Sequence, residues 1–216
     1  MPSRDAAPLP QPAPASSHDR ILQAAKQLFA GRGYENTSTV GIARLAGTSE
    51  SQLMKHFGSK EGLLEAIFEQ GWQKMGYLLR SIHALSSPAD KLQALLELVL
   101  KALERDPELK QLLLLEGRRV RKEGAIVLLT KGYLEFIAVL DGILGEMRAA
   151  DQLRPDLSLQ AVRSGLIGLF EGLMRDQILG QRLGYPAMYS TEEMRQLFSV
   201  VVDGLSANPS RPISSL

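Results

Sequence analysis

The strongest constraint on the fold is the spacing of apolar residues, which recur every three or four positions along most of the chain. The clearest case runs from Gly124 to about Met147, where one face carries Ile126, Leu129, Tyr133, Ile137, Leu140, Leu144 and Met147. This is the period of an α-helix that buries one face. No segment alternates in the manner of a strand, and no Asn-Gly or Asp-Gly turn separates apolar runs. The sequence therefore predicts an all-α protein.

Caps and helix breakers predict where the helices begin and end. A serine followed three residues later by Asp, Gln or Glu signals a helix start, and this pattern occurs at Ser16, Ser49 and Ser190. Proline is favoured in the first turn of a helix, and Pro88 and Pro107 open two more. The expected helices span residues 16–31, 37–46, 49–57, 60–79, 88–105, 107–115, 124–147, 158–183 and 190–205.

Composition and helix positions divide the chain into four parts. Residues 1–15 hold five prolines among alanine and serine, which predicts a disordered tail that packs no core. Residues 16–64 are expected to form a small three-helix head, and residues 65–206 a larger helical body. Residues 207–216 are predicted to be a flexible tail.

The overall composition limits location and partners. With 44% hydrophobic and 23% charged residues the chain is typical of a globular protein, and without cysteine it cannot depend on disulfides. No apolar run approaches the ~20 residues that span a bilayer, and the proline-rich start does not suit a signal peptide. We therefore expect no membrane association and a cytoplasmic location. The net charge of +1 requires any nucleic-acid binding to be local.

Two short helices joined through Gly47 predict a helix-turn-helix. Ile42 and Ala43 on the first helix are expected to pack against Leu53 and Phe57 on the second. The opposite face of the second helix can then enter the major groove of DNA.

The head also carries a longer set of residues at fixed spacing, which is more specific than this pattern alone. The set consists of Arg20-Ile21-Leu22, Ala24-Ala25, Leu28-Phe29, Gly33-Tyr34, Thr37-Ser38, Ile42-Ala43, Ala46-Gly47, Ser49, Leu53, His56-Phe57, Ser59-Lys60-Glu61 and Leu63. Over these roughly 50 residues the chain resembles the DNA-binding domain of the TetR (tetracycline-repressor) family. The resemblance implies a DNA-binding head, a ligand-binding and dimerising body, and a repressor that releases its operator when ligand binds.

The resemblance also implies which residues contact DNA. Phosphate contacts are expected at Thr37, Ser49, His56 and Lys60. Base contacts are expected at Glu50, Ser51, Gln52, Met54 and Lys55. Gln52 suits adenine, Lys55 suits guanine or a phosphate, and Glu50 suits cytosine N4. Alternatively, Gln52 only closes a capping box, Glu50 only favours the helix N-terminus, and Lys55 is a solvated side chain.

Departures from the family pattern indicate an uncommon operator. Met54 stands where many members have tyrosine, so an apolar side chain suited to a thymine methyl replaces a phosphate donor. Val40 stands where many members are polar or basic, and Thr48 replaces a buried valine. Between Asn36 and Lys60 three cations face one anion, which is a weak positive field.

Small residues form a stripe along the predicted helix 158–183, at Ala161, Gly165, Gly168 and Gly172. A glycine inside a helix costs about 1 kcal/mol relative to alanine, so the stripe needs a compensating close contact with another helix. The resemblance implies that this contact is a homodimer interface, a four-helix bundle that also buries Leu197, Val201 and Leu205. Two heads about 34–36 Å apart then require a palindromic operator in double-stranded DNA. Packing within one subunit is the alternative.

The resemblance further implies a site in the body for a small-molecule effector, which we expect to be largely apolar. The candidate lining residues are Trp72, Met75, Tyr77, Glu116, Tyr133, Phe136, Met147, Phe170 and Met174. Candidate polar anchors are Glu116, Arg118 and Arg175. Alternatively, aromatic and methionine residues at helical spacing simply form the core.

Two other functional classes have less support. For an enzyme or a metalloprotein, the histidines His18, His56 and His83 are far apart, and the sequence has neither a metal-ligating motif nor a nucleophile motif. We therefore expect no catalytic residue, metal or cofactor. The departures at Val40 and Met54 leave open an α-helical interaction module that has lost specific DNA binding.

Overall fold

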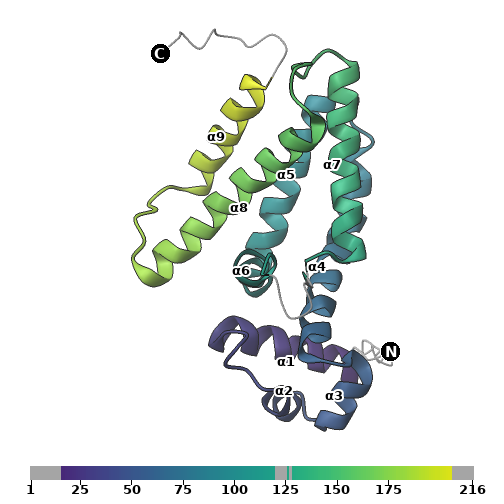
Figure 1. The fold of residues 1–216 in the computed structure, drawn as a ribbon, viewed down its shortest axis with the longest axis vertical. Coiled ribbons are helices and arrows are strands. Elements are labelled where there is room, and N and C mark those ends of the chain that lie inside the picture. The colour runs from purple at the N-terminus through teal and green to yellow at the C-terminus, as the bar shows by residue number, and fades with distance from the viewer. Residues whose placement is uncertain (1–15, 120–125, 127, 206–216) are drawn as a thin grey trace, which may run out of the picture.

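The structure is a computed structural model that describes residues 16–119, 126 and 128–205. The tails predicted at 1–15 and 207–216 lie outside these residues. Within them the chain forms no extended strand, which confirms the all-α prediction. The helices there (Figure 1) are α1 (Ser17–Arg32), α2 (Thr39–Leu45), α3 (Glu50–Phe57), α4 (Lys60–Ile82), α5 (Pro88–Arg105), α6 (Pro107–Glu116), α7 (Lys131–Ala149), α8 (Leu159–Leu183) and α9 (Thr191–Gly204).

The first three helices and the start of α4 form the head, at one end of the molecule (Figure 1). Each of these four helices begins after a serine whose hydroxyl accepts a first-turn N–H: Ser16, Ser38, Ser49 and Ser59. Their buried faces meet in a core that includes Ile21, Phe29, Ile42, Leu53 and Leu63. Gly47, with φ +64°, makes the turn between α2 and α3. The head therefore contains the expected helix-turn-helix.

The body is built around α4, which runs out of the head as one continuous helix. The predicted domain boundary at residue 64 therefore lies inside α4. In the body α4 and α5 both pack against α7, while α6 lies next to α1 at the end of the body nearest the head. Helix α8 packs against α6 and α7, and α9 packs against α8. This arrangement places α8 and α9 along one side of the molecule.

The start of α7 differs from the prediction. The apolar period places a helix start at Gly124, which lies outside the described residues, but α7 begins only after Thr130. Leu129, expected on the buried stripe, is 54% exposed. The physical reason is that buried Thr130 acts as the N-cap and ends the preceding loop.

The first turn of α7 is attached to α4 at Gly132. The Gly132 N–H donates to the Glu69 carboxylate at 2.8 Å. Burial, the largest influence, raises the pKa of Glu69, but its hydrogen bonds, above all that from Gly132, hold the pKa below its usual value. A Cβ at Gly132 would lie 2.5 Å from the Cβ of Trp72. Glycine therefore permits the close crossing of the two helices.

Gly132→Ala is expected to lower the free energy of unfolding by about 1–3 kcal/mol, because the added methyl overlaps Trp72 and one helix must shift. Urea denaturation followed by circular dichroism measures the change. The matched control is Gly142→Ala in the same helix, where the methyl meets open space and should be neutral or stabilise by up to ~1 kcal/mol. Equal effects of the two substitutions would contradict the close contact.

Candidate DNA-binding surface and ligand cavity

The outer side of α3 carries the residues expected to contact bases. Leu53 is fully buried in the head, and this determines which side of α3 faces outward. The exposed side chains are Glu50, Ser51, Met54, Lys55 and His56, with Gln52 half-buried beside them. Val40 of α2 is exposed as well. The surface thus offers both polar and apolar groups, which suits contact with base edges.

Hydrogen bonds connect α1 to α3 on this surface. The Ser17 hydroxyl lies 3.2 Å from His56 Nε2, and the Gln52 amide nitrogen lies 3.3 Å from the same atom. The Gln52 side chain is therefore engaged by His56, while the Ser49 hydroxyl caps α3. The expectation that the histidines are far apart is wrong for one pair, because the rings of His18 and His56 are 5.7 Å apart.

Thr37 does not present its hydroxyl to DNA, contrary to the expected phosphate contact. The residue is 4% exposed, and its Oγ1 donates toward the carbonyl oxygens of Gly33 at 2.8 Å and Leu28 at 3.2 Å. A buried hydroxyl needs an acceptor within the protein, and here it closes the loop between α1 and α2. The hydroxyl at the start of α2 belongs instead to Ser38.

Glu50 and Lys60 are held by neighbours at the edge of the same surface. The Thr39 hydroxyl donates to the Glu50 carboxylate at 2.5 Å and joins the starts of α2 and α3. The Lys60 ammonium lies 4.2 Å from the centre of the Tyr34 ring and 3.5 Å from the Glu35 carbonyl oxygen. These contacts tie the start of α3 to α2, and the start of α4 to the loop before α2.

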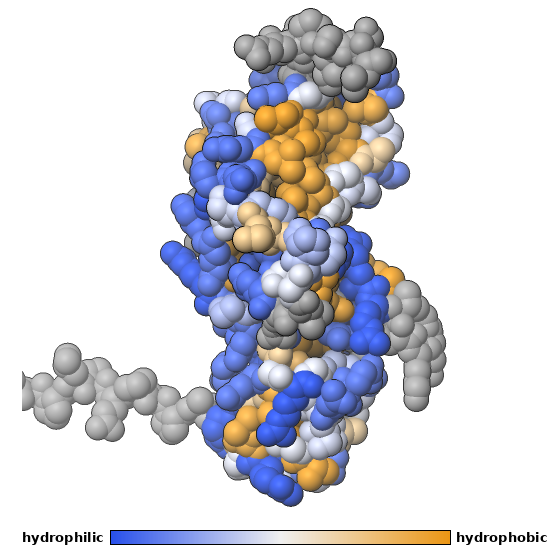
Figure 2. All heavy atoms as spheres, turned by 90° about the vertical axis from the view of Figure 1, so that its left-hand side faces the viewer, coloured by the Kyte–Doolittle hydropathy of each residue, from blue (hydrophilic) through white to orange (hydrophobic). Residues whose placement is uncertain are grey.

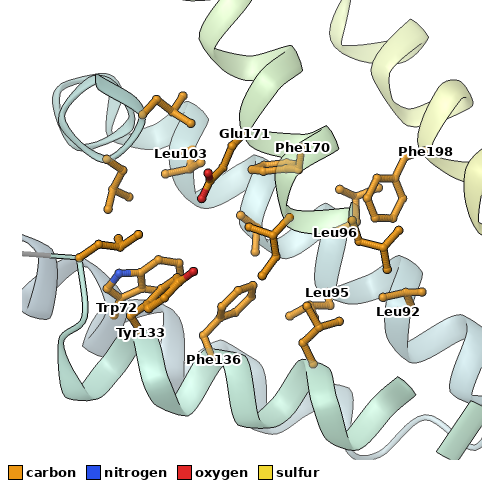
Figure 3. A pocket seen from close by; sticks show the side chains of 17 residues that line it. Trp72, Leu92, Leu95, Leu96, Leu103, Tyr133, Phe136, Phe170, Glu171 and Phe198 are labelled. Atoms are coloured by element: carbon orange, nitrogen blue, oxygen red, sulfur yellow. The ribbon is translucent and has the colours of Figure 1, made fainter. Parts of the chain in front are cut away.

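A second candidate site is a cavity of about 80 Å³ inside the body (Figure 3). Four of the predicted residues line it: Trp72, Tyr133, Phe136 and Phe170. Leucines of α5 and α6, with Phe198 of α9, complete most of an almost wholly apolar wall. The sequence did not single out these leucines, because a leucine stripe predicts burial equally well beside a cavity and in a filled core.

The predicted methionines do not line the cavity. Met75, Met147 and Met174 are at most 3% exposed and fill the core instead, as the alternative interpretation expected. The side chain of Tyr77 lies outside the described part of the structure.

Two of the three candidate polar anchors also have other roles. Glu116 does not line the cavity and pairs with Arg119 at 3.1 Å. Arg175 donates through Nε to the carbonyl oxygen of Leu114 at 3.1 Å, which ties α8 to α6. Their positions on the helices suited a pocket, but these partners direct both side chains elsewhere.

The third candidate anchor, Arg118, holds the charged residue of the cavity wall, Glu171. Its Nε and Nη2 donate to the two carboxylate oxygens at 2.6 and 3.0 Å, and Nη2 lies 3.4 Å from the Tyr133 hydroxyl. The hydrogen bonds to Glu171 raise the pKa of Arg118, and burial raises the pKa of Tyr133. At neutral pH Arg118 is therefore charged and Tyr133 is protonated.

The glycine stripe of α8 is open at the surface of the chain. A Cβ added at Gly165, Gly168 or Gly172 would meet no atom within 4 Å, and Ala161 is exposed. Within the described residues no helix of the same chain covers the stripe. This is contrary to the alternative of packing within one subunit.

Helix α9 also leaves apolar side chains uncovered. Leu197 and Val200 are 42% and 66% exposed, whereas Val201 and Leu205 are half-buried against the core. Figure 2 shows a continuous apolar area on the side of the molecule where α8 and α9 lie. Val200 was not predicted as part of this face.

A helix-turn-helix head on a helical body with an apolar cavity defines the class of helical DNA-binding regulators. The sequence model described as "Bacterial regulatory proteins, tetR family" matches residues 21–67, which span the head and the first part of α4. Nucleoid occlusion factor SlmA of Marinomonas sp. (strain MWYL1) is 26% identical over 163 residues, covering 74% of this chain and 81% of that protein.

Two further comparisons extend through the body. The fatty acid metabolism regulator protein of Bacillus subtilis (strain 168) is 27% identical over 158 residues, covering 70% of this chain and 78% of that one. The crystal structure of the transcriptional regulator FadR from Bacillus subtilis in complex with stearoyl-CoA has a TM-score of 0.65 and 20% identity, over 87% of this chain and 97% of that one.

Residues 21–67 thus carry the DNA-binding head of the TetR family of transcriptional regulators, and the relatives that extend through the body are regulators as well. Among the described residues, no helix combines the length and the apolar character needed to cross a bilayer. Nor do these residues contain a group of three side chains placed to hold a metal ion.

Thr37→Val is expected to lower the free energy of unfolding by about 1–3 kcal/mol, because it removes a buried hydrogen bond to the loop. It should leave the salt dependence of DNA binding unchanged. Lys60→Met is the comparison. If Lys60 contacts one phosphate, its loss should make the negative slope of log K against log salt less steep by about 0.9. Fluorescence anisotropy with DNA obtained by in vitro selection measures both slopes. A reduced slope for Thr37→Val would show that this residue contacts phosphate after all.

Proposed function

We propose that the chain is a TetR-family, ligand-responsive repressor that binds a palindromic operator as a homodimer and releases it when a small, largely apolar molecule enters the body cavity. The position of α6 carries the proposal, because α6 packs against α1 of the head and also forms part of the cavity wall. An element that contacts both sites can couple their states.

The first half of α6 and its N-cap are attached to the head by polar contacts. The Lys26 ammonium of α1 lies 2.7 Å from Asp106 Oδ2. The Gln111 side-chain amide donates to the carbonyl oxygen of Ala30 at 2.8 Å. Asp106 also caps α6, because its Oδ1 accepts the Leu109 N–H at 3.0 Å. The two oxygens of one carboxylate thus have separate partners.

The other end of α6 contributes Leu113 and Leu114 to the cavity wall. At about 80 Å³ the cavity is tight, and close-packed walls must move apart to admit an extended apolar molecule. Displacing α6 at this end alters the contact of Asp106 with α1 at the other end and that of Gln111 in the middle of the helix. A ligand that prefers the displaced state lowers DNA affinity by its differential affinity for the two states.

On the DNA side, the exposed residues of α3 and its flanks make the contacts. Bases are contacted by Glu50, Ser51, Gln52, Met54 and Lys55. Phosphates are contacted by Ser49, His56 and Lys60, helped by the amide groups at helix N-termini. Thr37 is excluded because it is buried.

A second copy of the chain covers the open face of α8 and α9. The glycine stripe lets two helices approach closely, and Leu197 and Val200 add apolar area to be buried. Two copies related by a two-fold axis carry two heads, so the operator holds two half-sites of opposite orientation. The effector is expected to be apolar because the wall is apolar, and the stearoyl-CoA bound to Bacillus subtilis FadR supports this choice.

In vitro selection from random DNA is expected to return a palindrome with half-sites one helical turn apart. Gly168→Arg should give a folded monomer, seen by analytical ultracentrifugation, whose affinity for that DNA is about a hundredfold lower or more. The control is Gly142→Arg, which also points into open space but lies on α7. A single unrepeated site, or dimeric Gly168→Arg, would overturn the dimer. Failure to enrich any sequence would favour an interaction module.

Lys26→Met tests the coupling through α6, with an effector recovered from a thermal-shift screen. We expect operator affinity without effector to stay within about threefold, because Lys26 is not among the residues proposed to contact DNA. The effector-induced loss of operator affinity should become about fivefold smaller or more, because the ion pair between Lys26 and Asp106 couples the position of α6 to α1. Lys101→Met, at an exposed position on α5, is the control. Unchanged release by Lys26→Met would exclude this route.

A further inference from the structure

The cavity wall contains a polar atom that the fold does not satisfy. Trp72 is 8% exposed, and its indole Nε1 finds no hydrogen-bond acceptor among the described residues. Leaving such a donor buried without an acceptor costs about 1–3 kcal/mol. The indole only donates, so the matching group on a ligand must be an acceptor.

A second donor belongs to the neighbouring ring of Tyr133. The rings of Trp72 and Tyr133 pack at 5.2 Å, and the Tyr133 oxygen already accepts a bond from Arg118. Its own proton has no acceptor within the described residues, and burial raises the pKa of Tyr133, so the hydroxyl keeps its proton at neutral pH. Both groups therefore favour a ligand that accepts hydrogen bonds.

The charge at this end of the cavity disfavours ionic ligands. Glu171 faces the cavity and forms an ion pair with Arg118, so neither an anionic nor a cationic group finds a free counter-charge there. Both of its oxygens are held by Arg118, so a cationic group would have to compete with a two-point ion pair. A neutral acceptor avoids both costs.

The polar groups gather at one end. Figure 3 shows Trp72, Tyr133 and Glu171 together at one end of the cavity, whereas Leu92 and Phe198 close the opposite end. A ligand that matches this wall carries its polar group at one end of an apolar chain.

We propose that the effector is a neutral carbonyl compound with an apolar chain, such as a ketone, ester, lactone or thioester. Its carbonyl oxygen accepts the Trp72 N–H, and its chain extends toward Phe198. The inference rests on the proposed function, since it names the chemistry of the same regulatory site.

Four probes with chains of similar length test this: methyl octyl ketone, the same molecule with a methylene group in place of oxygen, decanoate and decyltrimethylammonium. Trp72 is the sole tryptophan of the chain, so a change in tryptophan emission reports occupation of this cavity. Calorimetry then gives the affinity of each probe for the full-length protein. The ketone is expected to bind most tightly. Tighter binding of either charged probe would overturn the proposed ligand class.

Trp72→Phe keeps an aromatic ring and removes the donor. It should weaken ketone binding about fivefold to tenfold, the effect of one hydrogen bond, and change binding of the methylene analogue less than twofold. A defect in folding would weaken both probes alike, and equal losses would count against the proposal. Tyr133→Phe is the matched variant: if it alone weakens ketone binding, the carbonyl does not bind Trp72 and the assignment is wrong.

Anisotropy of the selected operator DNA separates the two proposals. Release of DNA by a charged probe would uphold the ligand-responsive repressor and overturn the carbonyl ligand. Trp72-dependent ketone binding without any change in DNA affinity would uphold the ligand class and overturn the repressor mechanism.

Discussion

The crossing of α4 and α7 at Trp72 and Gly132 is the contact on which the rest of the structure depends. Helix α4 belongs to both the head and the body, so whatever fixes α7 on α4 also fixes the body relative to the head. Because Gly132 has no side chain, the indole of Trp72 can pack against Tyr133 and Phe136 at 5.2 and 5.0 Å. These rings form one end of the cavity. The same crossing therefore determines both the frame of the molecule and the chemistry of its interior.

Most helix positions follow from local rules. Serine caps and the spacing of apolar residues locate helices within a few positions, because both signals reside in neighbouring residues. The capping box at Ser190 and Glu193 is complete. At the start of α7 the local signals disagree: the apolar period continues before Thr130, whereas Thr130 caps the helix and Glu69, distant in sequence, binds the first-turn N–H. There a tertiary contact prevails over the local pattern.

The candidate sites divide in the same way. The outward side of α3 could be predicted, because burial of Leu53 determines which side chains point away from the core. Thr37 could not, because its hydroxyl finds acceptors in a loop whose path no spacing rule describes. The leucines of α5 line a cavity only because the surrounding helices leave space between them. That space is a property of the assembled body and has no signature in any one helix.

The two oxygens of the Asp106 carboxylate bind different partners, and this has a mechanical consequence. One oxygen holds Lys26 of the head and the other holds the first turn of α6, so the ion pair can lengthen or break while the cap stays intact. The helix need not fray when the head moves. It can tilt as a rigid rod about a point between its two ends, and a helix of ten residues spans about 15 Å without losing a backbone hydrogen bond. A small displacement at one end is then carried to the other as rotation, without any step of local unfolding.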